Sequence, residues 1–216
     1  EDSFYPQIQR GINDYSDSYS DCKSFNNRKS CKEFSLPNPL PGYNGKSDHG
    51  IRSGNGIQIF DDGSKYEGNW NENLANGFGS YKLPNGSIYK GYWKNGRAFG
   101  DGIFSSADGS KYSGSWFNDK QHGKGKETYR DGSVYEGDFF EGFKHGKGIL
   151  YFTDTSYYDG DFLQNMMSGY GRYVWSDGKI YIGYFSQGKL HGRGTLLWPD
   201  GRKYMGNYFM DSKNGL

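Results

Sequence analysis

The stretch YEGDFFEGFKHGKG, from Tyr135 to Gly148, combines a histidine, two lysines and closely spaced glycines. These residues also build phosphate-binding loops and acid–base sites, so we first ask whether the stretch is unique. An active site is normally built once in a chain, whereas architecture is often repeated. This stretch is repeated, because a tyrosine followed by x-Gly returns every 23 residues, at Tyr43, Tyr66, Tyr89, Tyr112, Tyr135, Tyr158, Tyr181 and Tyr204.

Each 23-residue unit keeps the same internal pattern. Position three is glycine in every unit, and positions twelve and fourteen are glycine in every complete unit. Positions twenty and twenty-one read Asp-Gly or Asn-Gly, except at Asp154-Thr155. Position five is Ser47 in the first unit and aromatic in the others, at Trp70, Trp93, Trp116, Phe139, Phe162, Phe185 and Tyr208.

Composition indicates an all-β repeat. The chain contains 35 glycines and 19% aromatic residues, and each glycine in a helix costs roughly 1 kcal/mol relative to alanine. The alternation Tyr-x-Gly-x-aromatic has the period of two that is typical of a strand. An Asp-Gly or Asn-Gly dipeptide between two such runs is a strong hairpin signal. Each unit is therefore predicted to form strand, turn, strand, turn.

The pattern also predicts a register. We expect positions three and five to pair with positions fourteen and twelve across the first turn, and position one to face position sixteen. An odd repeat length needs one connection with an odd number of residues or with a bulge. We place it on the Asp-Gly side, as a three-residue loop at positions nineteen to twenty-one. The predicted product is an open antiparallel meander of about fifteen strands, which curls because open sheets rarely exceed about ten strands.

One face of this meander is predicted to be an aromatic trough. It would carry the repeated tyrosines, the fifth-position rings and most of the residues at position eighteen, with stability coming from contacts between units, as in solenoids. These position-eighteen residues are Phe60, Leu83, Tyr129, Phe152, Trp175 and Trp198. The other face would carry a mixed set that includes Glu67, Glu136, Asp138, Asp159, Lys124 and Lys147.

These units resemble a known repeat family. The units YSGSWFNDKQHGKGKETYRDGSV, YEGDFFEGFKHGKGILYFTDTSY and YIGYFSQGKLHGRGTLLWPDGRK look like the MORN repeat (membrane occupation and recognition nexus), with Tyr-x-Gly-x-Trp, then His-Gly-x-Gly, then Asp-Gly. The resemblance covers residues 43–216 as seven complete units and a truncated eighth. The histidine position departs in units one, two, three and six, and we expect the first unit to act as a cap. The departing residues are Ser53, Asn76, Phe99 and Ser168.

The resemblance implies an elongated, twisted, single-layer antiparallel meander of β-hairpins that forms an open trough. It implies a non-catalytic scaffold or binding module at membranes and cytoskeletal structures. Because such arrays also occur beside catalytic domains, a regulatory repeat domain of a larger enzyme stays open as an alternative. The implied location is cytoplasmic, at a membrane or cytoskeletal structure.

Residues 1–42 differ in kind from the array. They lack the period, are rich in Ser, Asn and Asp, and are predicted to be a leader or linker. Apolar residues such as Phe4, Ile8 and Ile12 suggest the hypothesis that part of this leader docks along the trough. Cys22 and Cys31 both lie in it, and a reduced pair is favoured over a bridge or a zinc site. The start at Glu1 rather than Met suggests a fragment.

The repeated histidines and glycine-lysine motifs do not indicate chemistry. His122, His145 and His191 occupy equivalent positions in units that are about 9–10 Å or more apart, which is too far to share a metal. No acid or nucleophile recurs with them. Gly-Lys-Gly resembles a phosphate loop only superficially, because no strand-to-helix transition follows it. We therefore expect no catalytic residue, no metal and no cofactor.

Two functions fit this repeat. The first is a protein-interaction scaffold that binds a partner segment along the trough, through Trp70, Trp93, Trp116, Phe139, Phe162, Phe185, Tyr129, Phe152, Trp175 and Trp198. The alternative is a module for phosphoinositide or other anionic membrane surfaces, through Lys124, Lys126, Lys147, Lys189 and Arg193. The net charge of +1 makes the field weak, and it argues against nucleic acid as a partner.

Self-association is a further expectation. The eighth unit stops after YMGNYFMDSKNGL, which would leave its last strand without its second half and expose an unpaired backbone edge. Two such edges can pair across a two-fold axis. The sequence therefore predicts a homodimer through the C-terminal edge.

Overall fold

The computed structural model describes residues 42–214, which contain strands and connections and no helix. The leader, its predicted docking and both cysteines lie outside this described range. Each strand pairs with its sequence neighbours in the order β1 to β16, in antiparallel fashion. The strands are β1 (Tyr43–Asp48), β2 (Ile51–Ile59), β3 (Lys65–Asn71), β4 (Leu74–Lys82), β5 (Ile88–Lys94), β6 (Arg97–Ser105), β7 (Lys111–Phe117), β8 (Lys120–Thr128), β9 (Val134–Phe140), β10 (Phe143–Tyr151), β11 (Tyr157–Leu163), β12 (Met166–Val174), β13 (Ile180–Ser186), β14 (Lys189–Leu197), β15 (Lys203–Phe209) and β16 (Ser212–Asn214).

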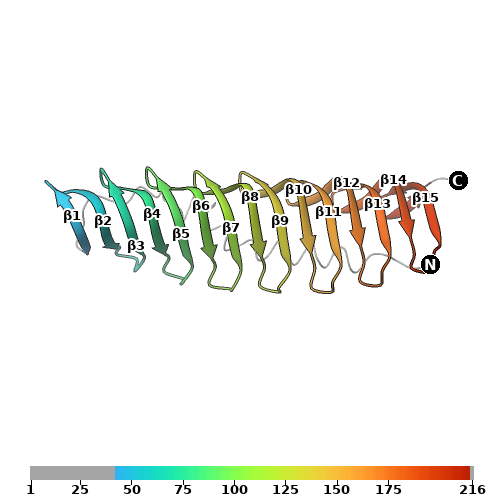
Figure 1. Cartoon of the computed structure of the whole chain (residues 1–216), viewed down its shortest axis with the longest axis horizontal. Coiled ribbons are helices and arrows are strands. Elements are labelled where there is room, and N and C mark those ends of the chain that lie inside the picture. The colour runs from blue at the N-terminus through green and yellow to red at the C-terminus, as the bar shows by residue number, and fades with distance from the viewer. Residues whose placement is uncertain (1–41, 215–216) are drawn as a thin grey trace. The chain divides into compact units, whose positions relative to one another are not determined.

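The predicted antiparallel meander of hairpins is confirmed. The described residues fall into two compact units, 42–127 and 128–214, and both are built from the same alternation of seven-residue and nine-residue strands. Figure 1 shows this alternation along the chain. The same local geometry repeats inside each of these two compact units.

Two kinds of connection alternate between the strands. The first is a two-residue turn with both residues left-handed, as at Glu72 (φ 48°) and Asn73 (φ 67°), which is the type I′ geometry that matches strand twist. The second is a five-residue loop such as 83–87, between the paired residues Lys82 and Ile88. The Asp-Gly or Asn-Gly dipeptide lies in this second loop. The Leu83 N–H donates to the carbonyl oxygen of Ser87 at 2.8 Å, and the Gly86 N–H donates to the carbonyl oxygen of Leu83 at 3.0 Å. These bonds leave residues 84–86 as a three-residue loop, as predicted at positions nineteen to twenty-one.

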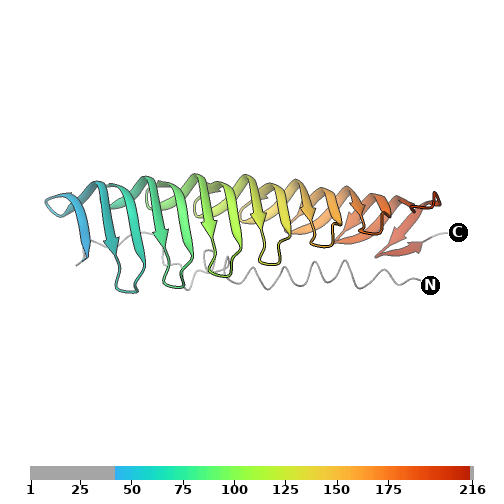
Figure 2. The same cartoon turned by 60° about the horizontal axis from the view of Figure 1, so that its bottom comes forward.

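A bulge beside most of the two-residue turns was not foreseen. Gly68 pairs with Gly79 as predicted, but Trp70 pairs with Ala75 rather than with Gly77. One residue of β3 thus faces three residues of β4, and Gly77 takes a positive φ of 92°. The bulge bends the strand, and Figure 2 shows the resulting curvature. The predicted pairing of positions five and twelve within a unit is wrong for this reason.

Glycine at position twelve instead pairs with the fifth-position ring of the next unit. Gly77 pairs with Trp93, and Gly146 pairs with Phe162. The ring and the glycine are therefore neighbours as expected, but across the five-residue loop.

The repeated tyrosine explains the glycines at positions three and fourteen. A Cβ on Gly68 would lie 2.7 Å from the Tyr66 hydroxyl, and a Cβ on Gly79 would lie 2.7 Å from Tyr66 Cζ. The hydroxyl donates a hydrogen bond to the carbonyl oxygen of Asn69 at 2.9 Å. The ring thus lies directly over the paired glycine backbones, where no other residue type would fit.

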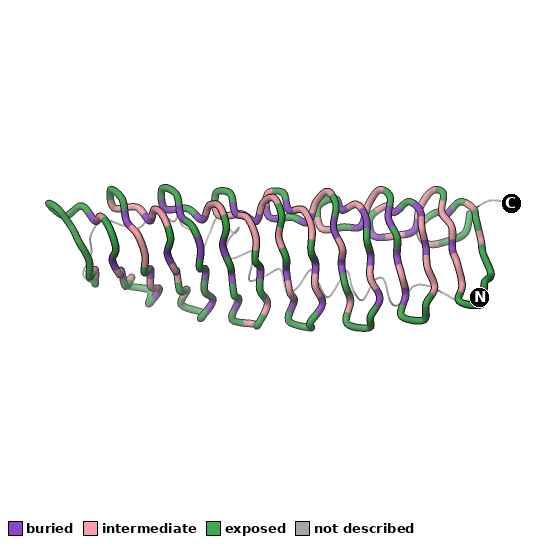
Figure 3. The backbone as a smooth tube through the Cα atoms, in the orientation of Figure 1, coloured by how far each residue is buried: buried purple, intermediate pink, exposed green. Residues whose placement is uncertain are grey.

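The rings form a ladder from unit to unit. Tyr66 packs edge-on against Trp70 and against Trp93, with centroids 4.9 and 5.3 Å apart. Edge-to-face pairs contribute about 0.5–1.5 kcal/mol each beyond their buried area. Trp93 Nε1 also donates to the carbonyl oxygen of Gly79 at 3.3 Å. Figure 3 shows buried and exposed positions alternating along the strands, with further exposed positions at the connections.

Neighbouring two-residue turns are joined by hydrogen bonds. The Asn73 N–H donates to the carbonyl oxygen of Arg52 at 3.2 Å, and Asn73 Oδ1 accepts the Arg52 N–H at 2.7 Å. The side-chain bond recurs only in alternate units, because position eight alternates between Asn or Asp and Gly. The acceptors are Asn73, Asp119, Asn165 and Asp211.

The two ends of the array differ from its middle. Arg52 is fully buried, lies 4.1 Å from the centroid of the Trp70 ring and donates to Gln58, so it covers the first ring of the ladder. At the other end, β16 pairs with residues 207–209 of β15. The predicted unpaired edge is therefore shortened, because β16 covers only residues 207–209 of β15.

Candidate functional site

The fifth-position rings predicted to bind a partner lie in the interior. Trp70, Trp93, Trp116, Phe139, Phe162 and Phe185 keep 3–5% of their surface exposed. At position eighteen, Tyr129 and Trp175 are buried and Phe152 and Trp198 are half-buried. These rings stabilise the ladder, and only Phe152 and Trp198 offer a substantial edge to a second molecule.

The basic residues predicted for anionic lipid lie on the outer surface. Lys124, Lys126, Lys147 and Arg193 are exposed, and Lys189 is half-buried. Lys147 Nζ forms an ion pair with Asp161 at 2.7 Å. Its charge is therefore already neutralised in part by a neighbouring strand.

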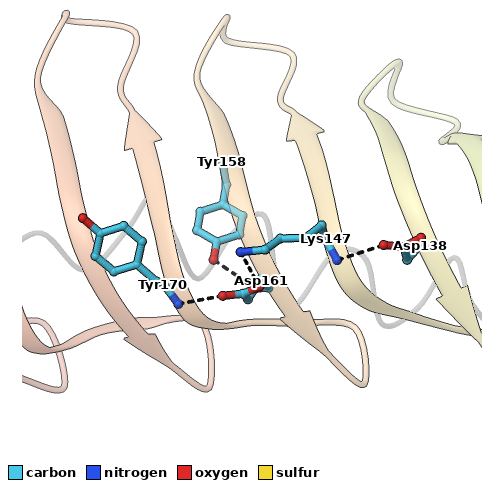
Figure 4. A network of polar contacts seen from close by, with 5 residues as sticks. All are labelled: Asp138, Lys147, Tyr158, Asp161 and Tyr170. Atoms are coloured by element: carbon cyan, nitrogen blue, oxygen red, sulfur yellow. Dashed lines mark hydrogen bonds and ion pairs between the residues drawn. The ribbon is translucent and has the colours of Figure 1, made fainter.

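Figure 4 shows how Asp138 and Asp161 hydrogen-bond to the backbone at the bulges. Asp138 Oδ2 accepts the Lys147 N–H at 3.1 Å, and Asp161 Oδ2 accepts the Tyr170 N–H at 3.0 Å. Tyr158 donates to the backbone carbonyl oxygen of Asp161 at 2.9 Å. The two carboxylates accept hydrogen bonds from backbone N–H groups that the bulges leave without a partner on the facing strand. The role of this cluster is therefore structural.

The repeated histidines pack against phenylalanines. The rings of His122 and Phe117 lie 5.6 Å apart, and those of His145 and Phe140 lie 5.7 Å apart. Within residues 42–214 no group of three or more His, Cys, Asp or Glu is placed to hold a metal ion.

The shifted pKa values follow from burial in the ladder. Burial raises the pKa of Tyr173 to about 12. It raises the pKa of the first-position tyrosines Tyr66 and Tyr158 by a larger amount. These phenols therefore stay neutral donors. Burial also raises the pKa of Asp119 to about 6, while the Ala98 N–H and the Arg97 charge oppose it.

One exposed apolar surface is a feature that sequence reasoning missed. Phe140 pairs with Phe143, and Leu163 pairs with Met166, at two neighbouring turns. These four side chains are 37–53% exposed. We call them the turn-face patch. A signal was available, because positions six and nine have the opposite parity from the buried positions five and ten.

Two solved structures with low sequence identity resemble this chain. No curated protein matches the chain in sequence. One similar solved structure is the TCP domain of SAS-4 (dCPAP) from Drosophila melanogaster, in complex with a proline-rich motif of Ana2 (dSTIL). It has 14% identity and a TM-score of 0.45, and the match covers 81% of this chain and 99% of that one.

A second is the TCP10 domain of CPAP from Danio rerio, with 16% identity, a TM-score of 0.29, and coverage of 78% of this chain and 92% of that one. Neither TM-score is high enough to bear on function. The described residues contain no helix that could cross a membrane.

The MORN repeat family matches seven consecutive segments, 43–65, 66–88, 89–111, 112–134, 135–157, 158–180 and 181–201. Their boundaries coincide with the tyrosine phase found in the sequence. Together with the hairpin meander, this match shows that the chain belongs to the MORN repeat family.

Proposed function

We propose that this chain is a non-catalytic protein-interaction module that binds an apolar segment of a partner protein. The turn-face patch carries this proposal. Soluble monomers rarely expose large contiguous apolar patches, and such patches mark interaction sites. The large rings of the ladder are buried, whereas these four apolar side chains are exposed and lie in cross-strand pairs at two adjacent turns.

The four side chains form one surface. Phe139 and Lys144 point inward and are buried, so their neighbours Phe140 and Phe143 point outward. The next turn is joined to Lys144, whose carbonyl oxygen accepts the Asn165 N–H at 3.0 Å. Two outward apolar pairs therefore lie on adjacent turns of a hydrogen-bonded frame.

This frame is suited to binding because it is rigid. Lys144 also donates its N–H to Asn165 Oδ1 at 2.8 Å, and a surface that is ordered before binding loses less entropy on association. The half-buried rings of Phe152 and Trp198 are the part of the predicted trough that remains available to the same class of partner. Family membership supports a place at a cytoskeletal or membrane-associated structure.

A peptide selection tests the proposal. A phage-displayed peptide library would be selected on the full chain and counter-selected on a Phe140→Ser/Leu163→Ser variant. A matched control is Tyr151→Ser, which removes an exposed ring at the opposite end of β10. We expect apolar peptides whose affinity falls about ten-fold or more in the patch variant and stays unchanged in the control.

The folding of each variant would be checked by circular dichroism and thermal unfolding. Peptides that bind the wild type and the patch variant equally would refute the proposal. So would a selection that enriches no apolar peptide.

A further inference from the structure

A second feature lies at the turn between β5 and β6. Lys94 and Arg97 form a directly opposed cross-strand pair, and both are exposed. Like charges directly opposite each other destabilise a sheet. At every other two-residue turn in residues 42–214, at least one member of the equivalent pair is uncharged. This turn therefore carries an electrostatic cost that its counterparts avoid.

No acid of the described chain relieves this cost at short range. Neither Lys94 nor Arg97 has a carboxylate oxygen within the 4.0 Å of an ion pair among residues 42–214. The Arg97 charge does act on Asp119, but that carboxylate accepts the Ala98 N–H at 2.7 Å. The two cations thus remain available to an anion from outside.

An aromatic platform lies beside the two cations. The rings of Phe99 and Phe117 are 5.7 Å apart at an angle of 50°, and Lys94 Nζ lies 5.0 Å from the centroid of Phe99. Phe117 is 43% exposed. Together with two asparagines, these residues line a surface depression of about 300 Å³, formed by Lys94, Asn95, Arg97, Phe99, Phe117 and Asn118. We call it the turn pocket.

We propose that the turn pocket binds an acidic segment of a partner protein in which an aromatic residue stands beside a carboxylate. The carboxylate would pair with Lys94 and Arg97 and remove their mutual repulsion. The aromatic ring would pack on Phe99 and Phe117, since aromatic pairs favour offset or edge-on contact. The asparagines supply amide donors and acceptors for the backbone of the segment.

A peptide fits this pocket better than a membrane surface does. Membrane attraction grows with the number of basic residues near the surface, at about 1 kcal/mol each, and the net charge of the chain is only +1. Two cations flanking a hydrophobic floor instead match a single carboxylate next to a ring. The turn pocket shares no residue with the turn-face patch, so either can fail without the other.

The test is a titration of the full chain followed by amide NMR spectra. The probe is the peptide GSDFEGS, compared with GSNFQGS, which lacks the charge, and GSDAEGS, which lacks the ring. We expect GSDFEGS to bind most tightly and to shift the amides of residues 94–99 and 117–118. Replacing Lys94→Ser and Arg97→Ser together should weaken binding about ten-fold, as expected for two exposed ion pairs.

Two controls keep the result interpretable. Lys111→Ser removes an exposed lysine from the other end of β7, where it pairs with Ser105, and should leave binding unchanged. The double variant should unfold at the same or a higher temperature than the wild type, because it removes a like-charge pair. Loss of binding in this variant is then not a loss of fold.

Three results would overturn the proposal. One is equal affinity for GSDFEGS and GSNFQGS, and another is binding that survives the double substitution. The third is flotation with vesicles containing phosphatidylinositol 4,5-bisphosphate that depends on Lys94 and Arg97 while GSDFEGS fails to bind, which would assign the pocket to membranes.

Discussion

The strongest test of the fold is to place a methyl group under a tyrosine ring. In Gly148→Ala the new Cβ would lie 2.5 Å from Tyr135 Cε2, which is closer than packed carbon atoms can approach. Gly148 does not have a positive φ, so the substitution introduces no backbone strain of its own. Its entire effect must come through the ring.

The magnitude follows from what the ring would lose. The Tyr135 ring is fully buried, and moving it off the glycines forfeits about 1.5–3 kcal/mol of burial. The hydroxyl would also lose its bond to the Asp138 carbonyl oxygen at 2.9 Å, which is worth about 1 kcal/mol. We therefore expect Gly148→Ala to lower the free energy of unfolding by about 3 kcal/mol.

Urea unfolding of four variants separates this mechanism from others. Gly132→Ala is the matched control, because Gly132 has a φ of +93° and its new Cβ would meet only Thr153 Cγ2, at an ordinary contact distance of 4.0 Å. Only the left-handed backbone penalty of about 1–2 kcal/mol therefore applies. In a Tyr135→Ala background, Gly148→Ala should cost less than about 1 kcal/mol, since the obstacle is gone. An equal cost with and without the ring would refute the reasoning, as would a cost no greater than that of Gly132→Ala.

Three further outcomes are expected. Burial raises the pKa of Asp119 to about 6, so the folded state binds the proton more tightly than the unfolded state, and the stability that Asp119 contributes is greatest below pH 4 and is lost as pH rises to about 6. The Asp119→Asn variant keeps the acceptor oxygen. It should flatten this profile in pH-dependent thermal unfolding and raise stability at pH 7 by about 1–3 kcal/mol. Arg52→Ala should cost about 3 kcal/mol in urea unfolding, because it strips the buried cover from Trp70; a cost below about 1 kcal/mol would show that the cover is dispensable. The C-terminal edge should give a mass of twice 24.5 kDa by light scattering, and a single-chain mass at high concentration would contradict the predicted homodimer.

Much of the fold was predictable because the spacing of the glycines and tyrosines reflects their structural roles. Position one opposite position sixteen, as at Tyr66 and Tyr81, and the glycine pair Gly68 and Gly79 were both predicted correctly. The tyrosine ring needs space over the backbone, and the paired glycines provide that space. The same arrangement recurs every 23 residues. The three-residue loop was predictable as well, because an odd repeat length requires a connection with an odd number of residues or a bulge.

The bulge escaped prediction for a different reason. Gly77 was interpreted as the partner of Trp70, whereas its left-handed backbone forms the bulge and its partner is Trp93. A glycine in a strand is compatible with both roles. Local sequence does not distinguish them, and the choice depends on how the next turn stacks on the previous one.

The sequence by itself determined the repeat, its hairpin units and the set of aromatic residues that stabilise them, because these depend on spacing and side-chain volume. Tertiary structure alone decided which apolar residues are left outside. Phe139 and Phe140 are adjacent and chemically identical, yet one is 3% and the other 53% exposed. Parity already places Phe140 on the face opposite Phe139, but the tertiary structure decides which face is buried. The register across the bulge also brings Lys94 opposite Arg97. The candidate sites lie outside the ladder because the ladder buries the aromatic rings that the repeat pattern identifies.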